Sequence, residues 1–147
     1  MSNARLHAYE VLLRVARVRE IRASLAQVEA LTEERTRRKG LEKIGTARMA
    51  LLAASHAVED GSKLDVARYE LLSILDATLG AKLQVASSQL TAAEKVSKER
   101  GAASVLAKRY REKICDKVSE TSDAIDRKCS TSQQEMAIEL WLESGTR

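Results

Sequence analysis

Large apolar residues in the first third of the chain recur at intervals of three, four and seven positions. The residues that follow this spacing are Val11, Val18, Ile21, Leu25 and Val28, with Leu13, Val15 and Leu31 beside them. Such a repeat is typical of the a and d positions of a coiled-coil helix. We call Val11, Val18, Ile21, Leu25 and Val28 the apolar stripe. We expect this stripe to be buried against a partner helix. A charge placed there, as in Leu25→Asp, should then disrupt helix pairing.

The repeat loses its apolar character at Thr32 and Arg35 and resumes further along the chain. The residues at which it resumes are Leu41, Ile44, Leu51 and Val58. Gly40 and Gly45 interrupt it, and glycine inside a helix costs about 1 kcal/mol relative to alanine. The pattern therefore predicts a first helix over about residues 4–60, with its softest part at these two glycines.

The clearest interruption in the sequence is the run Glu-Asp-Gly-Ser at residues 59–62. Gly61 suits the left-handed conformation in which many helices end. Ser62, followed by Asp65 three residues later, resembles the capping box that begins a helix. We expect the chain to reverse direction at residues 60–63.

A second helix is predicted over about residues 63–128. Its apolar side begins with Leu64, Ala67, Leu71 and Ile74, flanked by Leu72, Leu75 and Leu79, and continues through Val85, Leu90, Val96, Ala103, Leu106, Tyr110, Ile114, Val118 and Ile125. A Cys-Ser-Thr-Ser run at residues 129–132 predicts a lesser break, and Ser132 with Glu135 resembles another capping box. We therefore expect a short C-terminal helix over about residues 133–143.

Composition supports long helices. The 147 residues include no Pro and no Phe, and aromatic residues make up 3% of the chain, which argues for few loops and a thin core. We expect an all-α fold, a long antiparallel two-helix coiled-coil hairpin that spans residues 1–147 and carries the short C-terminal helix. The alternative is a four- or five-helix bundle with corners at Gly40, Gly80 and Gly101. We favour the hairpin because no proline or turn cluster follows these glycines.

Positive charge is concentrated at the start of the chain. The first 56 residues carry eleven Lys or Arg, nine of them Arg, and six Glu, whereas the remainder carries fourteen cations and fifteen acids. The Glu residues alternate with the Arg residues at helical spacing, and few aromatic side chains are available to stack on bases. We expect no binding of nucleic acid. The alternative, an Arg-rich helix that binds nucleic acid or a membrane surface, predicts binding that falls steeply with salt.

Side chains suited to catalysis or metal binding are sparse. His7 and His56 are far apart, and residues 40–47 lack the Lys and Ser or Thr of a phosphate-binding loop. Cys115 and Cys129 would lie roughly 21 Å apart along one helix, beyond the reach of a disulfide. We expect no enzymatic activity, no metal and no cofactor. With no apolar run near 20 residues and no signal peptide, we also expect a cytoplasmic protein without membrane insertion.

Two groups of apolar residues exceed what one coiled-coil contact needs. The first comprises Leu71, Leu72, Ile74, Leu75 and Leu79. It could serve as a partner site, or it could pack against residues 49–54 of the first helix. The second group surrounds Trp141, and for this residue we favour packing back onto Leu6, Tyr9 and Leu13, because a lone aromatic at a chain end is commonly an anchor.

The opening of the chain resembles the FliJ/YscO family, the small stalk proteins of flagellar and type III secretion export. The residues that carry the resemblance are Arg5-Leu6-His7, Val11-Leu12-Leu13-Arg14-Val15 and Arg17-Val18-Arg19-Glu20, followed by Ala23, Leu25, Ala26 and Val28. Length, the lack of proline and a reversal after about 60 residues also fit. The chain departs from secretion-type members in lacking a long Glu/Gln-rich tail and in having few aromatic residues in the second helix.

The resemblance implies a non-enzymatic central stalk or adaptor, cytoplasmic and peripherally associated with the secretion apparatus. Its partners would be an export ATPase hexamer, contacted through Arg14, Arg17, Arg19 and Arg22, and an export-gate membrane protein, contacted through Leu71, Leu72, Leu75 and Leu79. Members of the family can also bind escort chaperones. The alternative function is a generic coiled coil for dimerisation or scaffolding, in which the apolar stripe pairs between chains.

Overall fold

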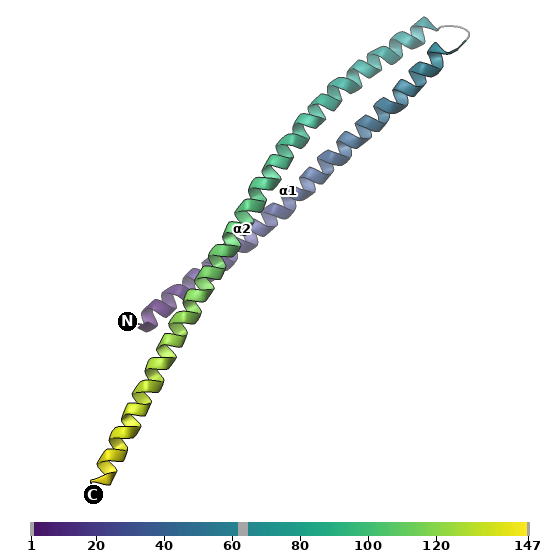
Figure 1. Cartoon of the computed structure of the whole chain (residues 1–147). Helices are drawn as coiled ribbons and strands as arrows, with labels where there is room; N and C mark the ends of the chain where they lie inside the picture. The colour runs from purple at the N-terminus through teal and green to yellow at the C-terminus, as the bar shows by residue number, and fades with distance from the viewer. Residues whose placement is uncertain (1, 62–64, 147) are drawn as a thin grey trace. The chain divides into compact units, whose positions relative to one another are not determined.

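The computed structural model describes residues 2–61 and 65–146, which form two α-helices and no strand (Figure 1). Helix α1 comprises Ser2–Glu59 and helix α2 comprises Val66–Gly145. The two helices pack against each other, so the predicted all-α hairpin is confirmed. Both helices run unbroken through Gly40, Gly80 and Gly101, which excludes the four- or five-helix bundle.

The chain divides into two compact units. Unit 1 comprises Met1–Ala23 with Ala103–Arg147, and unit 2 comprises Ser24–Ala102. In unit 2, Arg38 of α1 contacts Glu94 of α2, whereas Arg48, further along α1, contacts Asp76, earlier in α2. The helices are therefore antiparallel in this unit. In unit 1, Glu20 of α1 likewise meets Arg111 of α2.

Helix α2 begins with a side-chain cap. The Asp65 Oδ1 atom accepts a 3.2 Å hydrogen bond from the backbone N–H of Arg68, and the backbone N–H of Tyr69 donates a 2.9 Å hydrogen bond to the Asp65 carbonyl. This is the arrangement of an N-cap residue, which satisfies a backbone donor that the first helical turn leaves free. The predicted capping residue Ser62 and the predicted apolar residue Leu64 lie outside the described residues.

The predicted break at residues 129–132 was wrong, because α2 continues through this run to Gly145. Thr131 shows why a hydroxyl-rich segment can remain helical: its Oγ1 donates a 2.9 Å hydrogen bond to the carbonyl of Arg127, four residues earlier. A threonine hydroxyl can bond to the preceding turn in this way from within a helix, at a small cost in helix stability. The expected helix over residues 133–143 is therefore the last part of α2.

The contact between the helices is built from residues spaced alternately three and four apart. Along α1 the less exposed positions include Leu6, Tyr9, Leu13, Ala16, Glu20, Ala23, Gln27, Ala30, Glu34, Leu41, Ile44, Arg48, Leu51 and Val58. Along α2 they include Leu72, Asp76, Leu79, Leu83, Ala86, Leu90, Ala93, Ser97, Ser104, Ala107, Arg111, Ile114, Val118 and Ile125. Such spacing is the heptad pattern of a coiled coil.

Small side chains make this contact thin. Within the described residues the buried positions are Leu13, Ala16 and Ser97, and Ala16 is 0% exposed. Alanine and serine at contact positions allow two helices to approach closely, because the axial distance depends on the side chains at the contact. The low aromatic content of the sequence therefore corresponds to a narrow core of alanine, leucine and serine.

The apolar stripe is exposed, so the prediction that it forms the buried side of the first helix was wrong. Val11, Val18, Ile21, Leu25 and Val28 all belong to the exposed hydrophobic residues, and Leu25 is 59% exposed. Residues of the stripe alternate along α1 with the contact positions, which apart from Leu13 are alanine or polar in this stretch. Both sets have heptad spacing, but α2 packs on the set that contains Leu13 and Ala16.

The predicted apolar side of the second helix was also wrong in its first part, because the helix contact uses a neighbouring set of positions. Ala67, Leu71 and Ile74 are exposed, and the contact with α1 uses the neighbouring Leu72 and Leu79. Further along, Val85, Val96, Leu106 and Tyr110 are also exposed. Leu90, Ile114, Val118 and Ile125 are at contact positions as expected.

Candidate functional site

Four arginines lie exposed on α1 in unit 1, namely Arg14, Arg17, Arg19 and Arg22. Within the part of the chain that the structure describes, none of them forms an ion pair. Because residues three or four apart are neighbours on a helix, Arg14 and Arg22 lie on either side of Val18 in the apolar stripe. The result is a surface on which guanidinium groups alternate with exposed aliphatic side chains.

The leucines proposed for a second contact are divided between two environments in unit 2. Leu71 and Leu75 are exposed, together with Ile74, which is 64% exposed. Leu72 and Leu79 are half-buried at positions that contact α1. Two leucines of this segment are therefore at helix-contact positions, and three aliphatic side chains remain on the surface.

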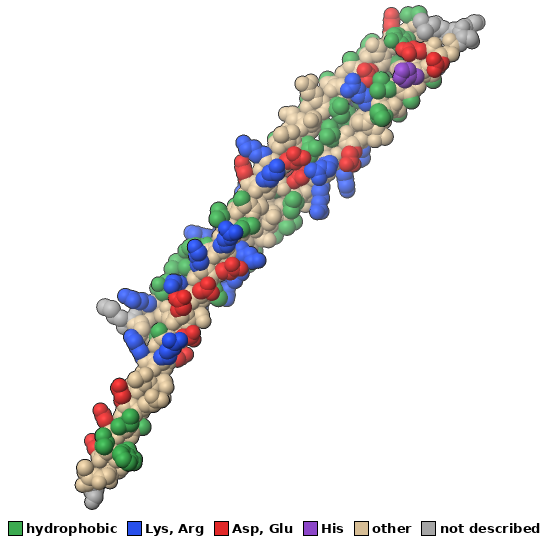
Figure 2. All heavy atoms as spheres, in the orientation of Figure 1, with side chains coloured by type: hydrophobic (Ala, Val, Ile, Leu, Met, Phe, Trp, Pro, Cys, Tyr) green, Lys and Arg blue, Asp and Glu red, His purple; other side chains and the backbone are tan. Residues whose placement is uncertain are grey.

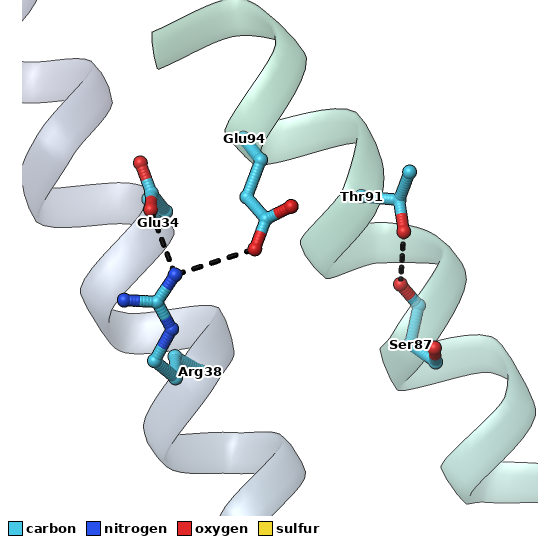
Figure 3. Close-up of polar contacts among 5 residues, drawn as sticks. All are labelled: Glu34, Arg38, Ser87, Thr91 and Glu94. Atoms are coloured by element: carbon cyan, nitrogen blue, oxygen red, sulfur yellow. Dashed lines mark hydrogen bonds and ion pairs between the residues drawn. The ribbon is translucent and has the colours of Figure 1, made fainter. Parts of the chain in front are cut away.

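Polar side chains cross the helix contact in unit 2. Arg48 Nε donates a 3.0 Å hydrogen bond to Asp76 Oδ1. One guanidinium nitrogen of Arg38 lies 2.9 Å from Glu34 on its own helix and 3.3 Å from Glu94 on α2 (Figure 3). Because α1 and α2 must be in one register for these groups to meet, such polar layers fix the alignment of the helices more than they add to stability.

A similar polar layer occurs in unit 1. Arg111 Nε donates a hydrogen bond to Glu20 Oε2, and both side chains are about one quarter exposed. This hydrogen bond raises the pKa of Arg111 above its ordinary value, so the guanidinium stays charged. These layers could not be predicted by following apolar residues alone. Extending the spacing backwards from Leu41 in steps of four and three would have reached Glu34, Gln27 and Glu20.

An open groove lies between the two helices of unit 1. Its lining includes Arg5 and Tyr9 from α1 with Lys117, Glu120 and Lys128 from α2. Lys117 Nζ lies 2.7 Å from Glu120 Oε2, and this hydrogen bond raises the pKa of the lysine. The groove therefore already contains an ion pair along one of its walls, and its remaining basic groups are spread along both helices.

No group of three or more His, Cys, Asp or Glu side chains within the described residues is placed to hold a metal ion. Cys115 and Cys129 are free thiols, half-buried and exposed respectively. Neither helix, over the residues that are described, contains an apolar stretch long enough to cross a bilayer.

The end of α2 is exposed throughout. Every described residue of α2 after Ile125 is exposed, and Trp141 is 73% exposed. The preferred expectation that Trp141 packs onto Leu6, Tyr9 and Leu13 was therefore wrong. The physical reason is the unbroken helix, because without a turn after residue 128 the final segment of α2 has no way to fold back onto α1.

Acidic and apolar side chains share this final segment, a feature that was not predicted from the sequence. Figure 2 shows red and green side chains next to one another along the last turns of α2. Met136, Glu139, Leu140 and Glu143 line one hollow on its surface. Glu135, Glu139 and Glu143 are four residues apart in the sequence, and this spacing places them in a row along one side of a helix.

No family model, no curated protein and no solved structure matches this chain.

Proposed function

We propose that the chain is a non-enzymatic stalk or adaptor protein that acts by binding other proteins along its two helices, in the export apparatus of a type III secretion or flagellar system. The observation that carries this proposal is the group of exposed arginines, Arg14, Arg17, Arg19 and Arg22, on a helical hairpin. Unpaired guanidinium groups on a rigid helix suit an acidic protein surface, because they form charge-assisted hydrogen bonds with carboxylates.

The acidic surface would belong to the loops of an export ATPase hexamer, whose ring the hairpin would enter as a central stalk. The resemblance of residues 5–28 to the opening of FliJ/YscO proteins supports this partner. The exposed Leu71, Ile74 and Leu75 would contact an export-gate membrane protein, because exposed aliphatic side chains clustered on one helix favour a protein contact. Escort chaperones are further candidate partners.

The test is to mix the full chain with a cognate export ATPase and measure hexamer formation and ATP turnover. The wild-type chain should stimulate both. Arg14→Glu with Arg17→Glu and Arg22→Glu should abolish the stimulation, since the variant presents carboxylates to an acidic surface. The matched control, Lys108→Glu with Arg109→Glu and Lys113→Glu, changes the net charge by the same amount at exposed positions of α2 in the same unit.

Helical content measured by circular dichroism should be the same in both variants, because all six side chains are exposed. Loss of stimulation only in the α1 variant supports the proposed contact. Equal loss in both variants would mean that net charge, and not the arginine surface, governs the interaction. No binding by the wild-type chain would remove the export ATPase as a partner.

A further inference from the structure

Two exposed surfaces within the described residues have complementary character. The first is the outer side of α1 in unit 1, where Val11, Val15, Val18 and Ile21 are exposed between arginines. The second is the final segment of α2, where Met136, Leu140 and Trp141 are exposed beside glutamates. An exposed apolar strip on a helix is the feature by which one helix binds another.

The two surfaces carry opposite charges. Residues 11–28 contain four arginines and one acidic residue, Glu20, which is paired with Arg111. Between Lys128 and Arg147 the only charged residues are Glu135, Glu139 and Glu143. None of these three glutamates forms an ion pair with another described residue.

Within residues 11–28 the one acidic residue is thus Glu20, which faces α2 through its contact with Arg111. The outer side of α1 in unit 1 is therefore basic and apolar, and the final segment of α2 is acidic and apolar. Complementary charges of this kind select the partner and its orientation, while the apolar side chains supply the area removed from water.

We infer that the final segment of α2 from one copy of the chain binds the outer side of α1 from a second copy. Met136, Leu140 and Trp141 would cover Val11, Val18 and Ile21, and Glu139 and Glu143 would pair with Arg14 and Arg22. The contact joins two different surfaces, so it is heterologous and each copy offers one of each surface.

Charge argues against the simpler contact in which the apolar stripe pairs with itself. Such pairing would bring Arg14, Arg17 and Arg22 of both copies together, and like charges placed against each other oppose association. The final segment of α2 replaces those arginines with glutamates at the same contact. Its unbroken helix also keeps it away from α1 of its own chain, which leaves a second copy as the source of the partner surface.

A contact of a few helical turns is smaller than a stable protein interface of about 1,200 Å² or more, so the association should be reversible and weak. The inference does not depend on the proposed function, because it concerns the chain by itself. The two are linked at Arg14, Arg17 and Arg22, where a second copy and an acidic partner protein would compete.

The test is sedimentation equilibrium of the full chain alone, over a range of concentrations at low salt. The average mass of the wild-type chain should rise with concentration, and the rise should diminish as salt is added. Glu139→Arg with Glu143→Arg should weaken association by about tenfold or more, and so should Arg14→Glu with Arg22→Glu. The control Glu70→Arg with Glu99→Arg makes the same charge change at exposed positions of α2 and should associate as the wild type does.

Mixing the two charge-reversed proteins should restore association, because the reversed α2 segment of one meets the reversed α1 surface of the other. Circular dichroism should show equal helicity in all variants, since every substituted residue is exposed. A single-chain mass for the wild type at all concentrations would overturn the inference. It would also be overturned if association were unaffected by Glu139→Arg with Glu143→Arg, the result expected for stripe-to-stripe pairing.

Discussion

Arg48 of α1 and Asp76 of α2 are joined across the helix contact of unit 2 by a 3.0 Å hydrogen bond, although they lie 28 residues apart in sequence. The guanidinium group also lies beside Gly80, where an added Cβ would be 3.5 Å from its Nη2 atom. The ion pair therefore sits against the backbone of α2 and holds α1 in one register.

Replacing Arg48 by Met should lower the free energy of unfolding by about 0.5–1 kcal/mol, because it leaves a half-buried carboxylate without its partner. Arg48→Met combined with Asp76→Leu should recover most of the loss, since no charge then remains in the contact. Urea unfolding of the two single variants and the double variant measures the coupling energy. A coupling energy of zero would show that the pair contributes nothing to stability.

Substitution of the buried Ala16 should lower the free energy of unfolding more than substitution of the exposed Leu25, although leucine is the more hydrophobic residue. Ala16→Leu forces a larger side chain into the close contact between the helices and should cost about 1–3 kcal/mol. Leu25→Asp places a charge on the surface and should change stability by no more than about 0.5 kcal/mol. Urea unfolding compares the two, and Ala8→Leu, an exposed position on the same helix, is the control for the added side chain.

The composition and the heptad spacing were enough to predict an all-α hairpin, but they could not identify which side of each helix is buried. In residues 11–28 two sets of positions have coiled-coil spacing, and the larger side chains belong to the exposed set. The set in contact with α2 contains Ala16 and Glu20, which hydrophobicity does not mark as core. Its register becomes visible only when the steps of four and three are traced back from Leu41.

The end of α2 was predicted poorly for a different reason. Ser and Thr at residues 129–132 are typical of helix ends, but their hydroxyls can also bond to the preceding turn, as Thr131 does with Arg127. The helix propensities of serine and threonine cannot distinguish a helix that ends at residues 129–132 from one that continues through them. Arg14, Arg17, Arg19 and Arg22 are exposed, because charged residues on the side of a helix away from a narrow contact remain in solvent.

Two glycines in the middle of α1 should be sites where the protein can be stabilised. An added Cβ at Gly40 or Gly45 would meet nothing within 4 Å, and both residues are helical. Gly40→Ala and Gly45→Ala should each raise the free energy of unfolding by about 0.5–1 kcal/mol. Ala47→Gly, at an exposed position of the same segment, should lower it by a similar amount. A destabilising alanine at either glycine in urea unfolding would contradict the open surroundings found there.

Trp141 is the only tryptophan in the chain, so its fluorescence reports on the final segment of α2 without interference. In dilute protein its 73% exposure predicts the emission wavelength and the acrylamide quenching of a solvated indole. Iodide should quench it less well than acrylamide does, because the neighbouring Glu139 and Glu143 repel an anion. If the segment binds a second copy, acrylamide quenching should fall as protein concentration rises. Glu139→Arg with Glu143→Arg should remove that concentration dependence and improve quenching by iodide. A Trp141 side chain that is protected from quenching even in dilute protein would contradict the exposed end of α2.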